Sequence, residues 1–213
     1  MAECPNLAIA GLPEYTPPAE NWFERYAANT LGRAWNSLKI RTSGYRDIIS
    51  HVNVHADAIA NLDTDQLRHN ALLLKGELRR NGYTPEIVGR VFALVRAAAV
   101  RTIGMRHYDL QLIAGYALLS GVITEMENGE GKTLAATLPA VTAALAGNPV
   151  HIITVNDYLA GRDARQMQPL YAALGLSVGV IEHDLDRDAR RQVYACDINY
   201  CSNKEVTFDY LRD

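Results

Sequence analysis

The sequence predicts an α/β fold in which a helical N-terminal part precedes a parallel β-sheet. Three observations lead to this class. Apolar residues recur at helical spacing as far as Gly104, and beyond it short apolar strands alternate with helices. Between the first of these strands and the next helix lies a glycine-rich loop, with MENGEGKT at residues 126–133. Strand, glycine loop and helix in this order are typical of α/β proteins that bind phosphate groups.

The N-terminal part contains no chemical motif of its own. Residues 1–18 carry four prolines without any periodicity, so a flexible tail is predicted there. Residues 19–104 are predicted to form a helical lead-in, with one helix within 20–38 and another over 44–60. The two tryptophans of the first of these helices are interpreted as packing anchors.

Two further helices of the lead-in have recognisable ends. Asp63, followed three residues later by Gln66, predicts a capping box at the start of the third helix. Thr84 followed by Pro85 predicts the cap and first position of a fourth, and Gly104 is the residue expected to end it.

Residues 105–213 are predicted to form a nucleotide-binding core built on a parallel sheet with helices on both faces. Its strands are expected at 122–126, 150–155, 178–181 and around 198–200, and the helices between them at 134–146, 158–174 and 186–195. In such sheets, ligands bind at the carboxyl ends of the strands, where the glycine loop is expected to lie.

The loop matches the P-loop pattern G-x-x-x-x-G-K-[ST], except that Met126 replaces the first glycine. Lys132 would reach the outer phosphates, and the hydroxyl of Thr133 would bind Mg²⁺. The residues predicted to hold the phosphates and the metal are Gly129, Glu130, Gly131, Lys132 and Thr133. The alternative interpretation is a glycine-rich turn with an exposed lysine.

Composition excludes some classes of protein. The formal net charge of −3 does not favour a general nucleic-acid binder, although a local basic groove stays open. Three cysteines without C-x-x-C spacing argue against a disulfide framework and fit a reducing compartment. The N-terminus lacks the basic and apolar regions of a signal peptide. His51 and His55 are spaced like metal ligands, but no third ligand is evident, so a metal site there is not expected.

Residues 104–213 resemble the start of the motor domain of the SecA family of preprotein translocase ATPases. The resemblance lies in GMRHYDLQLIAGYALLSGVITEMENGEGKTLAATLP, in HIITVNDYLAGRDARQMQPLYAALGLSVGVI, and in YCSNKEVTFDYLRD. The family also has methionine at the first P-loop position, as Met126 is here. Its last motif is TNNEFGFDYLRD, from which Ser202 and Lys204 depart.

The resemblance implies a RecA-like, helicase-type P-loop fold that uses ATP or ADP with Mg²⁺. It makes Gln111 the glutamine of a Q-motif that contacts the adenine edge, whereas the sequence alone favours an amide on a helix surface. The family's segment that couples the nucleotide state to the rest of the motor matches Thr154, Asn156, Asp157 and Arg162.

The resemblance also implies partners and a location. In the longer protein, ATP hydrolysis would drive unfolded preproteins through a membrane protein-conducting channel. The protein would be cytoplasmic and peripherally associated with the inner, plasma membrane, and no nucleic-acid partner is expected. An uncovered edge strand of the sheet would favour association into a homo-oligomer.

Hydrolysis needs acidic residues at the end of another strand, and in the family they lie beyond the FDYLRD segment. Glu182 and Asp184, after 178–181, are the local candidates, although the family places the pair on a different strand. The core is therefore predicted to be incomplete, to bind ATP and not to hydrolyse it efficiently. Two alternatives stay open: a non-hydrolysing, nucleotide-dependent binding protein, and one lobe of a nucleic-acid helicase.

Overall fold

The computed structural model describes residues 43–212 of the chain. The described residues lie within one compact unit of the chain, which begins at Ser43. The predicted tail at 1–18 and helix within 20–38 lie outside the described residues. The helices before residue 104 and the strands after it share one compact unit, and a domain division at that point stays a prediction.

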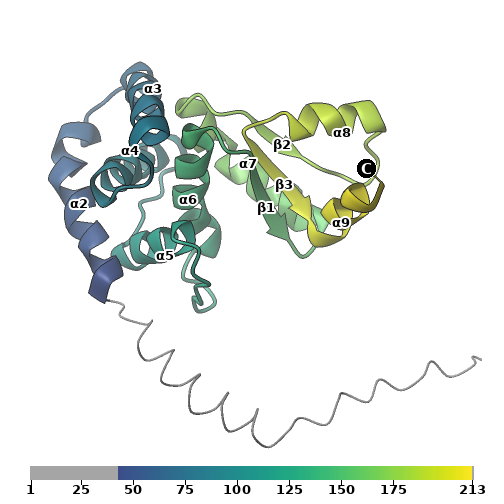
Figure 1. Cartoon of the computed structure of the whole chain (residues 1–213), viewed down its shortest axis with the longest axis horizontal. Coiled ribbons are helices and arrows are strands. Elements are labelled where there is room, and N and C mark those ends of the chain that lie inside the picture. The colour runs from purple at the N-terminus through teal and green to yellow at the C-terminus, as the bar shows by residue number, and fades with distance from the viewer. Residues whose placement is uncertain (1–42, 213) are drawn as a thin grey trace, which may run out of the picture. The chain divides into compact units, whose positions relative to one another are not determined.

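Within the described residues the chain forms helices first and a small sheet afterwards (Figure 1). The elements are α2 Ser43–Ala60, α3 Thr64–Asn81, α4 Pro85–Ile103, α5 Asp109–Leu119, α6 Lys132–Ala146, β1 Val150–Thr154, α7 Asp157–Ala173, β2 Val178–Val180, α8 Arg187–Tyr194, β3 Ile198–Ser202 and α9 Asn203–Arg212. None of the helices between residues 43 and 212 is both long enough and apolar enough to cross a membrane.

Helices α3 and α4 begin and end as their capping residues predict. The Asp63 carboxylate accepts from the backbone N–H of Gln66, whose side chain accepts from Asp63 N–H, and both bonds measure 2.8 Å. Thr84 caps α4, and Pro85 takes its first position, where no backbone donor is needed. Gly104 ends α4 with a φ of 67°, a left-handed conformation that glycine adopts at low cost.

The centre of the helical part is α4, which packs against α2, α3, α6 and α7. Most of its length is therefore covered, and its largest apolar side chains, among them Val91, Phe92 and Leu94, are fully buried. Each such side chain contributes about 1.5–3 kcal/mol through removal from water. Because α6 is one of the helices that pack on α4, this core sets the position of the helix that follows the glycine loop.

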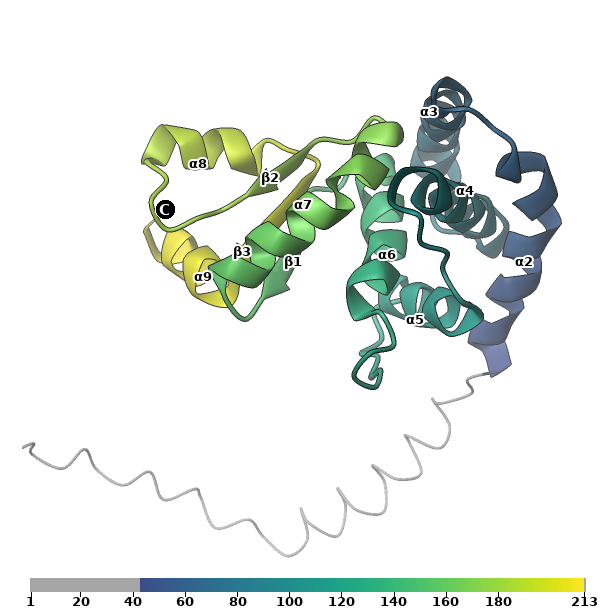
Figure 2. The same cartoon turned by 180° about the vertical axis from the view of Figure 1, so that it is seen from behind.

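The sheet is parallel, with strand order β1-β3-β2. Ile198 lies opposite Val150 on one side and Val178 on the other, and all of β3 is buried. Helix α7 packs on all three strands and crosses one face of the sheet (Figure 2). The buried hydroxyls of Tyr171 on α7 and Tyr200 on β3 are 3.0 Å apart. The strands predicted at 150–155, 178–181 and 198–200 are confirmed.

The strand predicted at 122–126 is wrong. This segment has no regular secondary structure and pairs with no strand of the described residues, and Ile123 is 96% exposed. A strand needs a neighbour to satisfy its backbone N–H and C=O groups, and no neighbour of residues 43–212 lies beside it. The prediction that helices cover both faces also fails at β1, an edge strand on which His151 and Ile153 are exposed.

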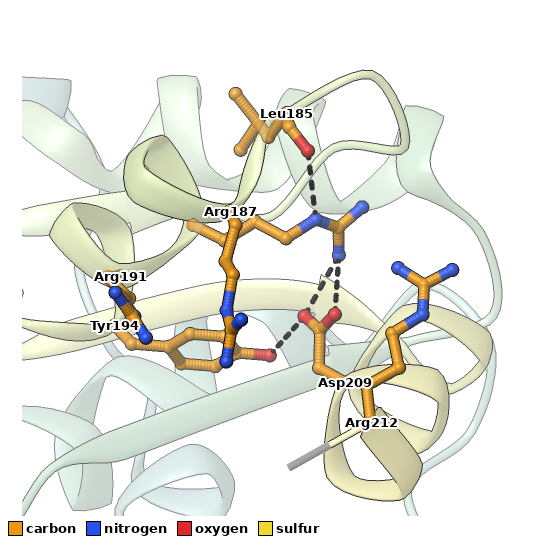
Figure 3. A pocket seen from close by; sticks show the side chains of 7 residues that line it. Leu185, Arg187, Arg191, Tyr194, Asp209 and Arg212 are labelled. Atoms are coloured by element: carbon orange, nitrogen blue, oxygen red, sulfur yellow. Dashed lines mark hydrogen bonds and ion pairs between the residues drawn. The ribbon is translucent and has the colours of Figure 1, made fainter.

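Helices α8 and α9 are held together by a buried arginine. Arg190 donates to Asp209 at 2.9 and 3.0 Å and to Glu205 at 2.6 Å, and its Nε donates to the carbonyl oxygen of Leu185 at 3.1 Å. Asp209 also accepts from the hydroxyl of Tyr194 at 2.8 Å (Figure 3). The arginine is 8% exposed, but carboxylates and carbonyl oxygens surround it, so this cluster has a structural explanation.

Candidate functional site

The glycine loop ends at the N-terminus of α6, and this helix start has no side-chain cap. Gly131 precedes it with a φ of 77°, and Gly129 has a φ of 91°, both in the left-handed region. The helices α3, α4, α7 and α8 are instead capped by the side chains of Asp63, Thr84, Asn156 and Asp186. The first N–H groups of α6 therefore keep their hydrogen-bonding capacity, and the helix dipole favours an anion there.

Lys132, the first residue of α6, folds back over the loop. Its Nζ donates to the carbonyl oxygen of Glu127 at 2.8 Å and to Oδ1 of Asn128 at 3.4 Å. Both acceptors are neutral, and Lys132 forms no ion pair within residues 43–212. The carboxylate of Glu130 accepts instead from the N–H of Glu127 at 2.7 Å. The loop thus carries an unneutralised ammonium group beside uncapped N–H groups.

Gln111, on α5, contacts the loop directly. It is 4% exposed, so the interpretation as a helix-surface amide is wrong. Its Nε2 donates to the carbonyl oxygen of Glu130 at 2.8 Å, and its Oε1 accepts from the N–H of Tyr108 at 3.0 Å. A Cβ at Gly131 would collide with this amide, so the loop needs glycine there for space as well as for φ. Gln111 therefore links the start of α5 to the loop.

A hollow of about 620 Å³ opens beside the loop. Its wall includes Gln111 and three partly exposed apolar side chains, which are Met105 at 37%, Tyr108 at 74% and Leu110 at 49% exposure. Residues 129–131 of the loop form another part of the lining. The hollow therefore joins an anion-attracting end to an apolar and aromatic wall, which suits a ligand that has both a charged and a flat apolar part.

Asp163, on α7, was not predicted as a site residue. It is 8% exposed, and its Oδ2 accepts from the hydroxyl of Thr133 at 3.4 Å. Its Oδ1 accepts from two nitrogens of Arg162, at 2.9 and 2.7 Å. A sequence signal existed, because Asp163 interrupts the apolar stripe of α7 between Ala160 and Ala164. The structure thus joins Thr133 and Arg162 through one carboxylate.

The other residues of the proposed coupling segment lie where β1 meets α7. The hydroxyl of Thr154 donates to the carbonyl oxygen of Asn156 at 2.9 Å, and the Asn156 side chain caps α7 at the N–H of Leu159 at 2.9 Å. Oδ1 of Asp157 is buried without a hydrogen-bond partner in the described part of the chain. These contacts fix the connection between the carboxyl end of β1 and the helix that carries Asp163.

Glu182 is not brought to the loop. It follows β2, which β3 separates from β1, whereas α6 packs against β1. Its side chain is exposed, and its carbonyl oxygen accepts from Arg190 at 3.1 Å. Asp184 is exposed in the same segment. The local acidic candidates therefore lie in the segment after β2, the edge strand farther from the helix of the glycine loop.

His107 fastens the segment before α5 to α6. It is 1% exposed, and its Nε2 lies 3.0 Å from both the carbonyl oxygen of Leu134 and the hydroxyl of Thr137. Because a carbonyl oxygen only accepts, Nε2 carries the proton, and the buried Nδ1 has no partner among the described residues. Burial lowers the pKa of His107 to about 4, although the bond to Leu134 acts in the opposite direction. The ring is therefore neutral in the folded protein at pH 7.

This pKa predicts a loss of stability at mildly acidic pH. The unfolded chain protonates His107 near pH 6.5 and the folded chain near pH 4, so the unfolded state binds more protons between these values. Stability due to this group is fully present above about pH 6.5 and falls by about 3 kcal/mol as the pH drops to about 4. Urea unfolding at about pH 7 and about pH 4.5 measures the fall, and His107→Gln should show a smaller one. His151→Gln, at an exposed histidine, is the control and should lose as much stability as the wild type. An equally large loss in His107→Gln would show that His107 is not the cause of the fall.

Comparisons with known proteins agree on one family. The model of a family described as SecA DEAD-like domain matches residues 32–213. A protein named Protein translocase subunit SecA 2 from Nitrosospira multiformis is 42% identical over 210 residues, 98% of this chain and 31% of the relative. Its namesake from Bordetella avium is 50% identical over 181 residues, 84% of this chain and 27% of the relative.

A third relative, named Protein translocase subunit SecA, comes from Solidesulfovibrio magneticus. It is 51% identical over 170 residues, which are 80% of this chain and 20% of the relative. The chain thus spans about a fifth to a third of the length of these relatives. The family match includes the glycine loop, Gln111 and the whole sheet described above. From this match, which extends over most of its length, the chain belongs to the SecA DEAD-like domain family.

Proposed function

We propose that the hollow beside the glycine loop binds ATP or ADP. The observation that carries this proposal is the uncapped N-terminus of α6 beside a lysine without a carboxylate partner. The first N–H groups of α6 and Lys132 would bind the phosphates, with Gly129, Glu130 and Gly131 forming the loop around them. Met105, Tyr108 and Leu110 would cover the base, because their apolar surfaces line the same hollow.

Mg²⁺ would enter with the nucleotide and bind the hydroxyl of Thr133. The residues fit this ion, because Thr133 is the second residue of α6, next to Lys132, and its hydroxyl lies 3.4 Å from a carboxylate oxygen of Asp163. Mg²⁺ prefers oxygen ligands and keeps several waters when it bridges phosphates. When bound, the ion neutralises charge on the phosphate oxygens. Asp163 orients the Thr133 hydroxyl and is itself held by Arg162.

For the longer protein we propose ATP-driven protein export. The support is the family match and the names of the relatives, which are protein translocase subunits. The protein would work at the cytoplasmic face of the inner membrane, with a protein-conducting channel and unfolded preproteins as partners. The test is transport of a radiolabelled preprotein into inverted membrane vesicles by the longer protein and by its Lys132→Ala variant. Transport that is equal in both would contradict the proposed role of this site.

Base choice tests the proposed role of Gln111. The Oε1 atom keeps one lone pair beyond its bond to Tyr108. The Nε2 atom donates to Glu130 at 2.8 Å and has only a weak second acceptor in Gly131 at 3.5 Å, which an acceptor on the base would replace. A donor beside an acceptor matches the edge of adenine and mismatches that of guanine. We expect ATP to be preferred to GTP, and Gln111→Ala to flatten this preference while retaining part of the phosphate-dependent affinity.

Competition of ATP and GTP against a fluorescent ATP analogue measures this preference in the wild type and in Gln111→Ala. Gln192→Ala, a change of the same kind on α8, is the matched control and should keep the wild-type preference. Equal competition by ATP and GTP in the wild type would contradict base reading. If Gln111→Ala lost affinity equally for ATP and GTP, Gln111 would only position the loop and would not contact the base.

A further inference from the structure

A second pocket, of about 520 Å³, lies between α2, α4 and the segment after α4. It shares Gly104 and Arg106 with the hollow beside the glycine loop, but its other lining residues are different. Small apolar side chains, among them Ala56 and Ala97, form much of its lining. The pocket therefore combines apolar surface with arginines, and it contains no part of the glycine loop.

The unusual residue of this pocket is Arg96, on α4. It is 6% exposed, yet its guanidinium has only weak partners, with Asn53 at 3.4 Å and Asp109 at 3.5 Å. Its Nε is buried and has no acceptor among residues 43–212. Burial lowers the pKa of Arg96, and the nearby charge of Arg106 acts in the same direction. A buried cation with so little compensation is costly, because it has lost its water without gaining a close anion.

Arg190 shows what a compensated arginine looks like in the same protein. It is buried to a similar degree, at 8% exposure, but it contacts two carboxylates at 2.6 to 3.0 Å. Arg96 has one carboxylate in reach, Asp109, whose side chain is 65% exposed and therefore stays largely hydrated. The difference between the two arginines indicates that an acceptor for Arg96 comes from outside the described residues.

Further charges around the pocket fit an anion. Arg101 and Arg106 also line it, both are exposed, and neither forms an ion pair within the described residues. Against these three arginines the lining contains one carboxylate, Asp57. The field in the pocket therefore favours negative charge, and the alanines leave room for a small apolar group beside it.

We propose that this pocket is a second anion-binding site, for a carboxylate or phosphate group carried on a small apolar body, with the guanidinium of Arg96 as its anchor. The anion would give Arg96 the close acceptor that it lacks, and such charge-assisted bonds are about twice as strong as neutral ones. The apolar body would lie on the alanines of α2 and α4. The site is distinct from the nucleotide site, because neither Lys132 nor residues 129–131 line it.

The test uses NMR of the arginine Nε–H groups in the full 213-residue chain carrying Lys132→Ala, so that the glycine loop does not compete for phosphate. The probes are butyrate, inorganic phosphate and butan-1-ol, and Arg96→Lys assigns the Arg96 signal. Butyrate should shift that signal saturably. Butan-1-ol, which has the same apolar body without the charge, should not. A lower affinity for phosphate than for butyrate supports the contribution of the apolar body. An affinity for butan-1-ol equal to that for butyrate overturns the need for an anion.

Variants locate the site without relying on the buried arginine. Arg101→Gln should weaken butyrate binding about 3- to 10-fold, and Asp57→Asn should strengthen it about 2- to 5-fold. Ala97→Leu, which fills the pocket, should abolish it. The controls are Arg80→Gln on α3 and Ala58→Leu on α2, exposed positions outside the pocket. Unchanged binding in Ala97→Leu, or equal effects of Arg80→Gln and Arg101→Gln, would overturn the site.

Discussion

Replacement of Lys132 by alanine should weaken the binding of Mg-ATP and of ADP by about 10- to 150-fold. In the structure its ammonium group contacts neutral oxygens of Glu127 and Asn128 and is neutralised by no carboxylate of the described residues. A phosphate group would replace these contacts with charge-assisted ones. The loss of one such bond costs about 1.5–3 kcal/mol, which corresponds to this range of affinity.

Calorimetry with each nucleotide measures the effect. Lys204→Ala is a matched control, because Lys204 is also exposed and also lies in the first turn of a helix, α9, but does not follow the glycine loop. It should bind both nucleotides with wild-type affinity. If Lys132→Ala bound ATP as tightly as the wild type, the loop would be the glycine-rich turn of the alternative interpretation.

Family membership confirms the RecA-like P-loop class, and the sequence predicted most of the elements that build it. The accurate predictions rest on local chemistry. Asp63 with Gln66, Thr84 with Pro85, and Gly104 act on their own helix ends, so they need no knowledge of the rest of the fold. The strand at 150–154 is short and largely apolar, and it lies between α6, which ends at Gly147, and α7, which Asn156 caps.

The errors and omissions depend on contacts between distant segments. Residues 122–126 have the apolar character of a strand, but a strand also needs a neighbour, and residues 43–212 supply none there. Gln111 is buried because its amide meets a loop 19 residues away. Asp163 meets Thr133 across 30 residues, and His107 meets Leu134 across 27. Periodicity cannot detect such pairs, although a polar residue on the apolar stripe of a helix does indicate a buried polar contact.

Turnover of ATP by residues 1–213 should be far below about 1 s⁻¹, even though the nucleotide binds. Binding needs the uncapped start of α6 and Lys132, which the structure provides. Hydrolysis also needs a carboxylate that orients water and a cation on the transferring phosphoryl group. Asp163 contacts Thr133, but its carboxylate is held by Arg162, and Glu182 follows the strand farther from the loop. The lack of an arginine finger is by itself enough to lower the hydrolysis rate by about 10³- to 10⁵-fold.

Steady-state phosphate release decides this prediction, with the wild type, Lys132→Ala, Glu182→Gln and Asp163→Asn compared side by side. We expect a rate near the background set by Lys132→Ala for all of them, because Arg162 holds the carboxylate of Asp163 and Glu182 follows the strand farther from the loop. Wild-type release near 1 s⁻¹ that Glu182→Gln abolished would show that Glu182 reaches the phosphates and that these residues hydrolyse ATP unaided. If Asp163→Asn abolished that wild-type rate, Asp163 would instead be the residue that orients water. Arg162 would then have to release the Asp163 carboxylate when the nucleotide binds.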